Sequence, residues 1–404
     1  MVKKILLHIS IVNAVVLSTS LLMPAMNAVA IQVIPKGINQ ALGEDKAISE
    51  ARFKANFKTA VMTYRKELRT FWPNAEVSST TRAVFYSKQF SEKRVIDFKA
   101  NEIQISTPNI RKGSVLDYRK MQIELHSAIS SLLSMNMISA INNDPINRAM
   151  EQLTGIRYAQ DLDTMGKDLI LGELFSNERP SSKAIERMAS KLTKTAYIRY
   201  PAVASLSLAL NIQERTNYIV KLPQKRLRLK AKAYKPFINE NAQKYRLPAS
   251  LIFAIIHAES SFNPLARSQA PAFGLMQIMP YTAGKDASNL IYNKVKILSP
   301  SYLYNPKANI QVGSAYFHIL YYRYLKDITD SRARMYCAIA AYNAGTGAVM
   351  TTLAGRNSIR KAVPIINKMK ANDVLRKLIR QLPSAETRHY LNKVLSLKKT
   401  YAQI

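Results

Sequence analysis

The sequence holds a single cysteine, Cys337, so no disulfide can form within the chain. Cys337 lies in the apolar stretch 335–341, which favours a small core residue over a nucleophile. No cysteine stands near residue 30, so we expect no lipid to be attached there. The His, Cys and acidic residues show no metal-ligand spacing, and we predict that the protein uses no metal and no other cofactor.

Acidic residues are also scarce. The chain has 26 Asp and Glu against 59 Lys and Arg, which gives a formal net charge of +33. Such a surplus predicts attraction to a polyanion, such as nucleic acid, anionic lipid headgroups or an acidic cell-wall polymer. The alternative is a general bias towards lysine that serves only solubility, because the charge is spread along the whole chain.

Long apolar runs are missing after the first thirty residues. Lys3 and Lys4 precede a mainly apolar stretch, 5–23, and Ala28-Val29-Ala30 supplies small residues for a signal peptidase. We therefore interpret residues 1–30 as a secretory signal peptide that is cleaved after Ala30, with an uncleaved membrane anchor as the alternative. This predicts an exported, periplasmic protein with no nucleic-acid partner, whose contact with the outer membrane would be peripheral.

Residues 31–220 mix helix and strand patterns, which predicts an α+β N-terminal domain. Apolar residues at spacings of three and four indicate helices, and alternating or β-branched runs indicate strands. The predicted elements are helices over 48–68 and 118–137, strands over 82–88 and 205–212, and a hairpin over 95–105. This region contains no chemical motif, so we assign it no catalysis.

Residues 221–235 are predicted to connect this domain to a second one. They carry seven cations, which are Lys221, Lys225, Arg226, Arg228, Lys230, Lys232 and Lys235. Two interpretations stay open: a cationic patch that docks on an anionic surface, or the solvated face of a helix.

Residues 236–404 show helix signals almost throughout, which predicts a mainly α domain. Pro248 is typical of a helix start, and glycines are typical of a helix end. Helices are predicted over 248–259, 307–325 and 331–343, the last of which Gly345 and Gly347 should end.

Glu259 closes the apolar run 251–258. A carboxyl group at the end of a buried helix loses hydration, which favours its neutral form and raises its pKa. Such a group is a candidate proton donor near neutral pH. A solvated acid at a helix end is the ordinary alternative, and the sequence downstream of Glu259 decides between the two.

Three short blocks follow in order: E-S-S-F-N-P from Glu259, G-L-M-Q-I-M-P from Gly274 and A-Y-N-A-G from Ala341. In this order and spacing they resemble the soluble lytic transglycosylase domain, a family with a lysozyme-like fold that cleaves peptidoglycan. The resemblance covers about residues 217–401 and includes the block 383–390. It looks closest to a membrane-bound branch whose members typically carry a lipid, for which this chain lacks the cysteine.

The number of acids bears on the reaction. An ordinary glycosidase uses two carboxylates. Residues 251–404 hold only Glu259, Asp286, Asp327, Asp330, Asp373 and Glu386. None besides Glu259 sits in a catalytic-looking block. One acid suffices where no water is activated, because Glu259 could protonate the glycosidic oxygen and then take the proton of the muramic C6 hydroxyl, which closes a 1,6-anhydro ring.

The resemblance implies the remaining roles. Ser268 would orient the substrate acetamido group, and Gln277 and Met279 would line the sugar cleft. Tyr342 would hydrogen-bond or position Glu259, and Asn343 would support the turn beneath it. Gly274 would allow the chain to approach the sugar or the Glu259 helix closely. Met279 as plain core and Tyr342 as a packed aromatic residue are the structural alternatives, and His257 is interpreted as structural.

The predicted function is therefore non-hydrolytic cleavage of the bond between N-acetylmuramic acid and N-acetylglucosamine, in cell-wall turnover or remodelling. The predicted partner is peptidoglycan, whose stem-peptide carboxylates would attract the cationic chain. A lysozyme-type hydrolase with a second carboxylate and a non-catalytic wall-binding protein remain as alternatives.

Overall fold

The computed structural model describes residues 49–108, 115–155, 168–176, 179–199 and 215–403. Residues 48–404 form one compact unit, so the N-terminal and C-terminal regions pack together rather than standing apart. The signal peptide predicted over 1–30 and the strand predicted over 205–212 lie outside the described residues. The division into domains at residues 220 and 235 stays a prediction.

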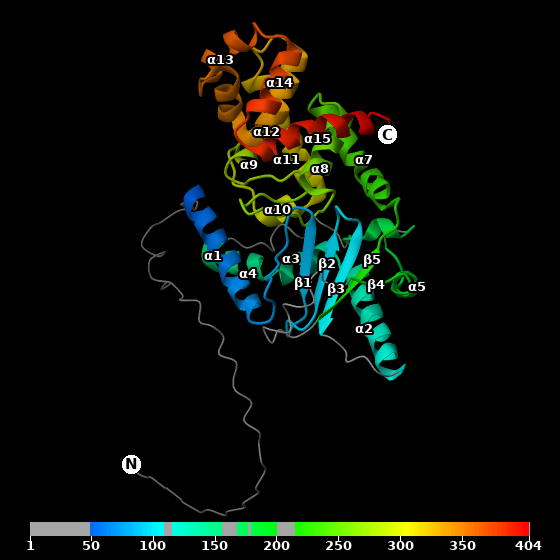
Figure 1. Ribbon diagram of the computed structural model, residues 1–404. Coiled ribbons are helices and arrows are strands. Elements are labelled where there is room, and N and C mark those ends of the chain that lie inside the picture. The colour runs from blue at the N-terminus through cyan, green and yellow to red at the C-terminus, as the bar shows by residue number, and fades with distance from the viewer. Residues whose placement is uncertain (1–48, 109–114, 156–167, 177–178, 200–214, 404) are drawn as a thin grey trace, which may run out of the picture. The chain divides into compact units, whose positions relative to one another are not determined.

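The N-terminal region is built on an antiparallel sheet with the strand order β1-β2-β3-β5-β4 (Figure 1). Its strands are β1 Arg82–Tyr86, β2 Lys93–Asp97, β3 Glu102–Pro108, β4 Tyr197–Ile198 and β5 Arg215–Lys221. The predicted hairpin is confirmed as β2 and β3, and Asn101 takes a positive φ of 56° in its turn. The strand predicted over 82–88 is confirmed as β1.

The register of the sheet separates an apolar face from a charged one. Ala83, Ile96, Ile103 and Val220 stand opposite one another on adjacent strands and are all fully buried. Because side chains alternate between faces along a strand, the row next to it points to the other side. That next row is Arg82, Asp97, Glu102 and Lys221.

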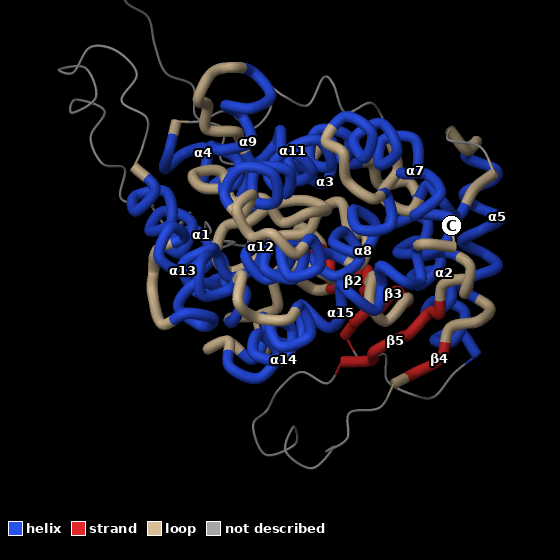
Figure 2. Tube along the Cα trace, turned by 90° about the horizontal axis from the view of Figure 1, so that it is seen from above, coloured by secondary structure: helices blue, strands red, loops and turns tan. Residues whose placement is uncertain are grey.

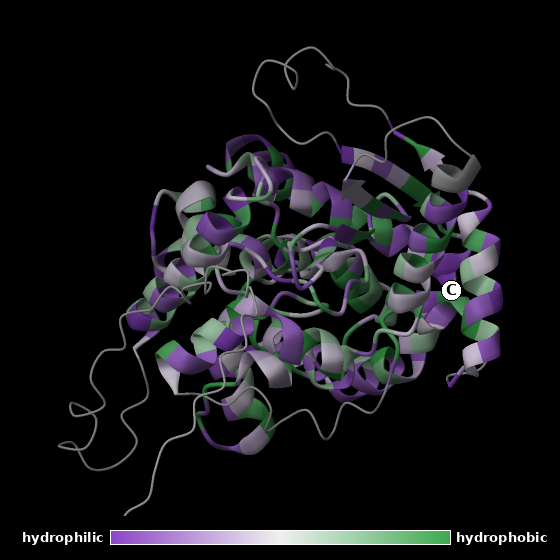
Figure 3. Ribbon diagram, turned by 90° about the horizontal axis from the view of Figure 1, so that it is seen from below, coloured by the Kyte–Doolittle hydropathy of each residue, from purple (hydrophilic) through white to green (hydrophobic). Residues whose placement is uncertain are grey.

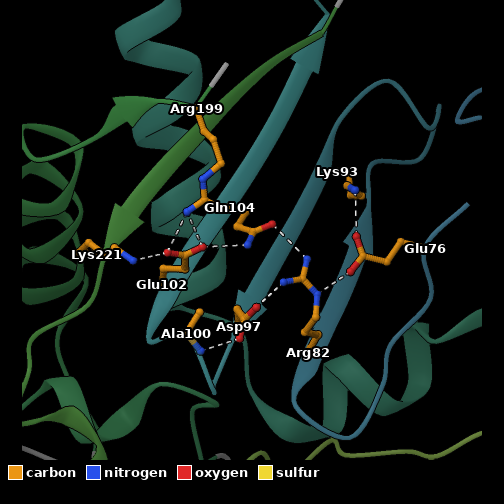
Figure 4. Close-up of polar contacts among 9 residues, drawn as sticks. All are labelled: Glu76, Arg82, Lys93, Asp97, Ala100, Glu102, Gln104, Arg199 and Lys221. Atoms are coloured by element: carbon orange, nitrogen blue, oxygen red, sulfur yellow. Dashed lines mark hydrogen bonds and ion pairs between the residues drawn. The ribbon is translucent and has the colours of Figure 1, made fainter. Parts of the chain in front are cut away.

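The charged row belongs to a continuous polar network (Figure 4). Glu76 accepts from Arg82 Nε at 2.6 Å and from Lys93 Nζ at 3.0 Å. Arg82 also pairs with Asp97 and donates to Gln104 at 3.0 Å. The network continues from Gln104 to Glu102, which also pairs with Arg199 and Lys221. These contacts link β1 to β2 and to β3, and β3 to β5, and so stabilise the sheet through its polar face.

The helices of the N-terminal region are α1 Glu50–Arg69, α2 Val115–Leu133, α3 Met137–Asn143, α4 Pro145–Thr154 and α5 Ser182–Thr193, with a short 3-10 turn η3 Gly172–Leu174. The helix predicted over 48–68 is confirmed, and Ser49 caps it by accepting from the Arg52 amide at 3.2 Å. The helix predicted over 118–137 is α2, which ends four residues early because Asn136 begins α3 as its N-cap.

The C-terminal region is helical (Figure 2). Its elements are α7 Arg226–Lys244, α8 Ala249–Ser260, α9 Ala283–Tyr292, α10 Pro300–Tyr304, α11 Pro306–His318, the π-helical turn η4 Ile319–Tyr324, α12 Ser331–Ala354, α13 Ile359–Ile366, α14 Ala371–Gln381 and α15 Ala385–Tyr401. The fold class, an α+β region followed by a mainly α one, is confirmed.

The helix predicted to stop at Gly345 is interrupted there, because Gly345 leaves helical geometry with φ 81° and ψ 155°, and a second helical segment of α12 follows to Ala354. One helix boundary differs from expectation. The helix predicted over 307–325 changes to π-helical turns after His318. None of the described helices combines the length and apolar character needed to span a membrane, and hydrophilic and hydrophobic residues are mixed along them in Figure 3.

Both interpretations of the basic connection are wrong for two of its seven cations. Arg226 and Lys230 are buried one turn apart on α7, and both pair with Glu173, at 3.1 Å and 2.9 Å. Arg226 also donates to the Phe98 carbonyl and Lys230 to the Ile170 carbonyl. Burial lowers the pKa of Lys230, but the charge of Glu173, the interaction with Tyr234 and the hydrogen bond to Glu173 together outweigh it, and the net shift is upward. These cations therefore join α7 to the N-terminal region.

We predict that Glu173→Gln lowers the free energy of unfolding by about 3 kcal/mol, because it leaves two buried cations without a counter-charge. Arg376→Gln, in an exposed pair with Asp373, is the control and should change stability by about 0.5 kcal/mol or less. Chemical denaturation measures both. A loss for Glu173→Gln as small as that of the control would show that the buried network does not hold the two regions together.

Candidate active site

Glu259 lies in the last turn of α8, as predicted. The preceding residues 251–256 are all buried, which anchors the helix in the core. The helix ends sharply because Ser261 and Phe262 both take positive φ, 51° and 63°, a conformation that non-glycine residues rarely adopt. Buried Ser260 ties this end to the G-L-M-Q block by donating to the Leu275 carbonyl at 2.9 Å. The carboxyl group is therefore presented from a fixed position.

Burial raises the pKa of Glu259 to about 7. The interaction with the Tyr390 hydroxyl and the charge of Lys393 lower it in part, while the charge of Glu386 raises it further. Glu259 itself is half-buried, and the direction of the pKa shift agrees with the expectation of a carboxyl group that has lost hydration. A group with this pKa exchanges its proton near neutral pH, which is what a combined acid and base requires.

The three residues that tune Glu259 come from α15, which packs along α8 (Figure 1). Lys393 Nζ also donates to the Ala258 carbonyl at 2.9 Å, next to Glu259 in the chain. Sequence reasoning gave Glu386, Tyr390 and Lys393 no role. Their spacing of four and three residues places them on one face of a helix, and this pattern is the signal that could have found them.

His257 packs at the end of α8 as a structural residue. Its Nδ1 lies 3.1 Å from the Tyr401 hydroxyl. Burial, assisted by the charge of Lys393, lowers the pKa of His257 to about 4, so the ring is neutral at neutral pH. Cys337 is likewise a core residue, fully buried, and burial raises the pKa of its thiol to about 12. Within the described ranges, no three His, Cys, Asp or Glu side chains gather where they could hold a metal ion.

Asn309, a residue of α11, holds the G-L-M-Q block in position. Its side-chain oxygen accepts from the Met276 amide at 2.7 Å, and its nitrogen donates to the carbonyls of Phe273 and Leu303 at 2.9 Å and 2.7 Å. Gly274 stands against this amide: a Cβ there would lie 2.4 Å from Asn309 Nδ2 and 2.2 Å from the Leu303 oxygen. The close approach that Gly274 permits is therefore to Asn309 and Leu303, not to the helix of Glu259.

Gln277 and Met279 follow in the same block. Gln277 takes a positive φ of 50°, and its side-chain Nε2 donates to the Gly274 carbonyl at 2.9 Å. Its Oε1 is buried and accepts no hydrogen bond from the described part of the chain. A buried acceptor without a donor is suited to a hydroxyl or amide of a bound ligand. Met279 is half-buried, so it is not plain core.

Tyr342 and Asn343 lie on α12 just before its kink. The Tyr342 hydroxyl donates to the Met276 carbonyl at 2.8 Å. Burial raises the pKa of Tyr342, and the nearby charge of Glu259 raises it further, which places the two side chains in one environment. Asn343 Oδ1 accepts from the Thr387 hydroxyl at 2.7 Å, which joins α12 to α15. Asn343 and Glu386 line a cavity of about 330 Å³.

Ser268 is placed in a second cavity, of about 620 Å³, between its own loop and α1. Its hydroxyl donates to the Ala270 carbonyl and accepts from the Ala272 amide, the latter at 3.3 Å. The structure thus gathers Glu259, Tyr342 and the α15 residues in one environment and puts Ser268 at the edge of another.

The N-terminal region contacts the E-S-S-F-N-P block directly. Asn263 Nδ2 donates to the Thr80 carbonyl at 3.1 Å. Buried Arg267 pairs with Asp144 at 2.9 Å, at the start of α4. The loop that follows Glu259 is therefore held from both sides, by α11 and by the N-terminal region.

Comparison with known proteins gives a family match. The family model described as the transglycosylase SLT domain matches residues 236–363. A membrane-bound lytic murein transglycosylase C of Pectobacterium atrosepticum is 32% identical over 325 residues, which cover 79% of this chain and 82% of the relative. The relative of the same name from Photorhabdus laumondii is 43% identical over 182 residues, which are 45% of this chain and half of that relative.

Solved structures resemble the chain more distantly. The crystal structure of the 70 kDa soluble lytic transglycosylase of Escherichia coli is 18% identical, with a TM-score of 0.35, and the match covers 72% of this chain and 44% of that one. A complex of the 70 kDa soluble lytic transglycosylase with bulgecin A matches with a TM-score of 0.35 and 17% identity, over 89% of this chain and 52% of that one.

We predict that Gly274→Ala lowers the free energy of unfolding by about 3 kcal/mol, because it adds a clash to an unfavourable φ. Gly355→Ala is the matched control: Gly355 has a similar φ of 67°, but a Cβ there meets no atom within 4 Å. The control should lose only about 1 kcal/mol. Denaturation curves compare the two variants, and equal losses would contradict the importance of the contact with Asn309.

Proposed function

Because this chain belongs to the membrane-bound lytic murein transglycosylase C family, we propose that it cleaves peptidoglycan glycan strands without water. Glu259 gives its proton to the β-1,4 glycosidic oxygen between N-acetylmuramic acid and N-acetylglucosamine, and the bond from that oxygen to the muramic C1 breaks. The Glu259 carboxylate then removes the proton of the C6 hydroxyl, and the C6 oxygen bonds to C1. The products are a free N-acetylglucosamine end and a 1,6-anhydromuramic end, and Glu259 regains its proton.

The observation that carries the proposal is the position of Glu259 in the last turn of the buried helix α8, where burial raises its pKa to about 7. The first step needs a protonated acid and the second needs a base. A pKa near the working pH lets one group do both in turn.

The neighbouring residues are proposed to bind the sugar. Gln277 offers its buried Oε1 as an acceptor, and Ser268 orients the acetamido group. Met279 lines the cleft, while Tyr342 and Asn343 fix the segment opposite Glu259 through Met276 and Thr387. Gly274 contributes by letting Asn309 hold the block in place.

A second candidate function is hydrolysis, which one observation favours. The charge of Glu386 acts on Glu259 and so supplies a carboxylate close to the site, and a second carboxylate could activate a water. Glu386 is exposed, however, and the relatives are named transglycosylases. We therefore assign Glu386 to tuning Glu259 and contacting the substrate.

We propose an exported, periplasmic location for the chain. The relatives are named membrane-bound, and the high positive charge would favour both anionic membrane surfaces and the carboxylates of the wall. Contact with the membrane is proposed to be peripheral. The proposed biological role is turnover or remodelling of the cell wall.

Mass spectrometry of digested peptidoglycan tests the reaction. The chain should release anhydro-muropeptides, and Glu259→Gln should lower turnover by a factor of about 10² to 10⁴, because glutamine donates no proton to the leaving oxygen. Unchanged circular dichroism and wall binding of the variant are the control. Products one water heavier would support the hydrolase instead, and an active Glu259→Gln variant would remove Glu259 from the mechanism.

The pH dependence of kcat/KM on a soluble glycan strand tests the electrostatics. Activity should fall above about pH 7, where Glu259 loses its proton. Glu386→Gln removes a charge that raises the pKa of Glu259, so the fall should come at lower pH. Lys393→Met removes a charge that lowers this pKa, so the fall should come at higher pH. Shifts of both variants in the same direction would contradict these assignments.

A further inference from the structure

The larger of the two cavities described above lies outside the environment of Glu259. About 620 Å³ in volume, it is lined by three segments that are distant in the sequence: one face of α1, residues 77–80 and residues 267–271. We call it the α1 cavity. Ser268 is the residue that it shares with the proposed sugar site.

The walls of the α1 cavity are held by specific contacts. Phe57 of α1 meets Phe273 edge to face, with ring centroids 6.0 Å apart, and Phe53 lies 5.2 Å from Tyr281. These contacts bring α1 against the G-L-M-Q block. The Thr80 carbonyl is bonded by Asn263, as described above. The cavity is thus a built part of the compact unit rather than a gap between loose segments.

Cationic, apolar and uncharged polar side chains line the α1 cavity, and no acidic residue is among the described residues that line it. Lys54, Lys58 and Arg65 follow one stripe of α1, together with Val61 and Met62. Met62 is 59% exposed. Lys54 pairs with Glu50 at 2.5 Å, whereas Lys58 and Arg65 make no ion pair with any described residue.

This composition defines the ligand by its chemistry. Free cations beside an exposed apolar strip suit a flexible molecule that has both carboxylates and small apolar side chains. The peptide stem of peptidoglycan has both. It is attached to muramic acid beside the acetamido group that Ser268 is proposed to orient.

We propose that the α1 cavity binds the peptide stem of the glycan strand whose sugars occupy the Glu259 site. The inference rests on the proposed function, since it places the sugar by that site. It gives the N-terminal region a task in substrate selection: strands that carry peptides bind more tightly than bare strands. Lys58 and Arg65 supply the charge, and Val61 and Met62 supply the apolar contact.

The test measures binding in the Glu259→Gln chain, so that turnover does not interfere. The two probes are a tetrasaccharide with stem tetrapeptides and the same tetrasaccharide after an amidase has removed them. The chain should bind the peptide-bearing probe about fivefold more tightly, since two exposed charge pairs give modest energies. Adding Lys58→Gln and Arg65→Gln should remove this difference without changing the affinity for the bare probe.

The matched control is Lys66→Gln with Arg69→Gln, which removes the same charge from exposed positions of the same helix outside the cavity. It should keep the preference. The preference should also shrink at high ionic strength, which screens exposed charges. Thermal unfolding of each variant verifies that α1 is still folded.

Equal affinity of the Glu259→Gln chain for both probes would overturn the inference, as would an undiminished preference after the change of Lys58 and Arg65. A Lys58 and Arg65 variant that loses binding to anionic phospholipid vesicles, while its parent shows no peptide preference, would assign the cavity to a membrane surface instead. Failure of the proposed function would appear separately, as the absence of anhydro products from the native chain. The binding comparison needs no turnover and decides the inference in either case.

Discussion

The arrangement of the site depends on one buried amide, Asn309. Three hydrogen bonds from its side chain hold the segment 273–276, and the Leu303 carbonyl with it, in a single geometry. That segment in turn accepts the hydroxyls of Ser260 and Tyr342 through its carbonyls. The end of α8 and the middle of α12 are therefore both hydrogen-bonded to the same short backbone segment. Both hydrogens of the amide nitrogen and its oxygen are engaged, and a satisfied buried polar group of this kind makes its surroundings rigid.

What the sequence could predict was local. The apolar run before Glu259 and the raised pKa that follows from its burial needed only the identity of neighbouring residues, and both agree with the structure. The strand pattern of the hairpin and the helical period of α1 are likewise short-range signals. The motif order supplied the family, and the match over residues 236–363 confirms it.

The features that the sequence could not predict depend on contacts between segments that are distant in the chain. A run of seven cations suggests a solvated surface, yet Glu173, more than fifty residues earlier, draws Arg226 and Lys230 into the interior. The role of Lys393 depends on α15 lying along α8. In each case the deciding partner is far away in the chain, where periodicity and spacing carry no information.

The joint between the two regions also bears on how such a chain can evolve. A helical catalytic segment that begins at α7 would, if moved to another protein, expose Arg226 and Lys230 without their counter-charge and leave Asn263 and Arg267 without Thr80 and Asp144. Recombination at this boundary would therefore transfer a sequence but not a finished fold. Such a transfer would need new partners for these buried groups on the accepting side of the joint.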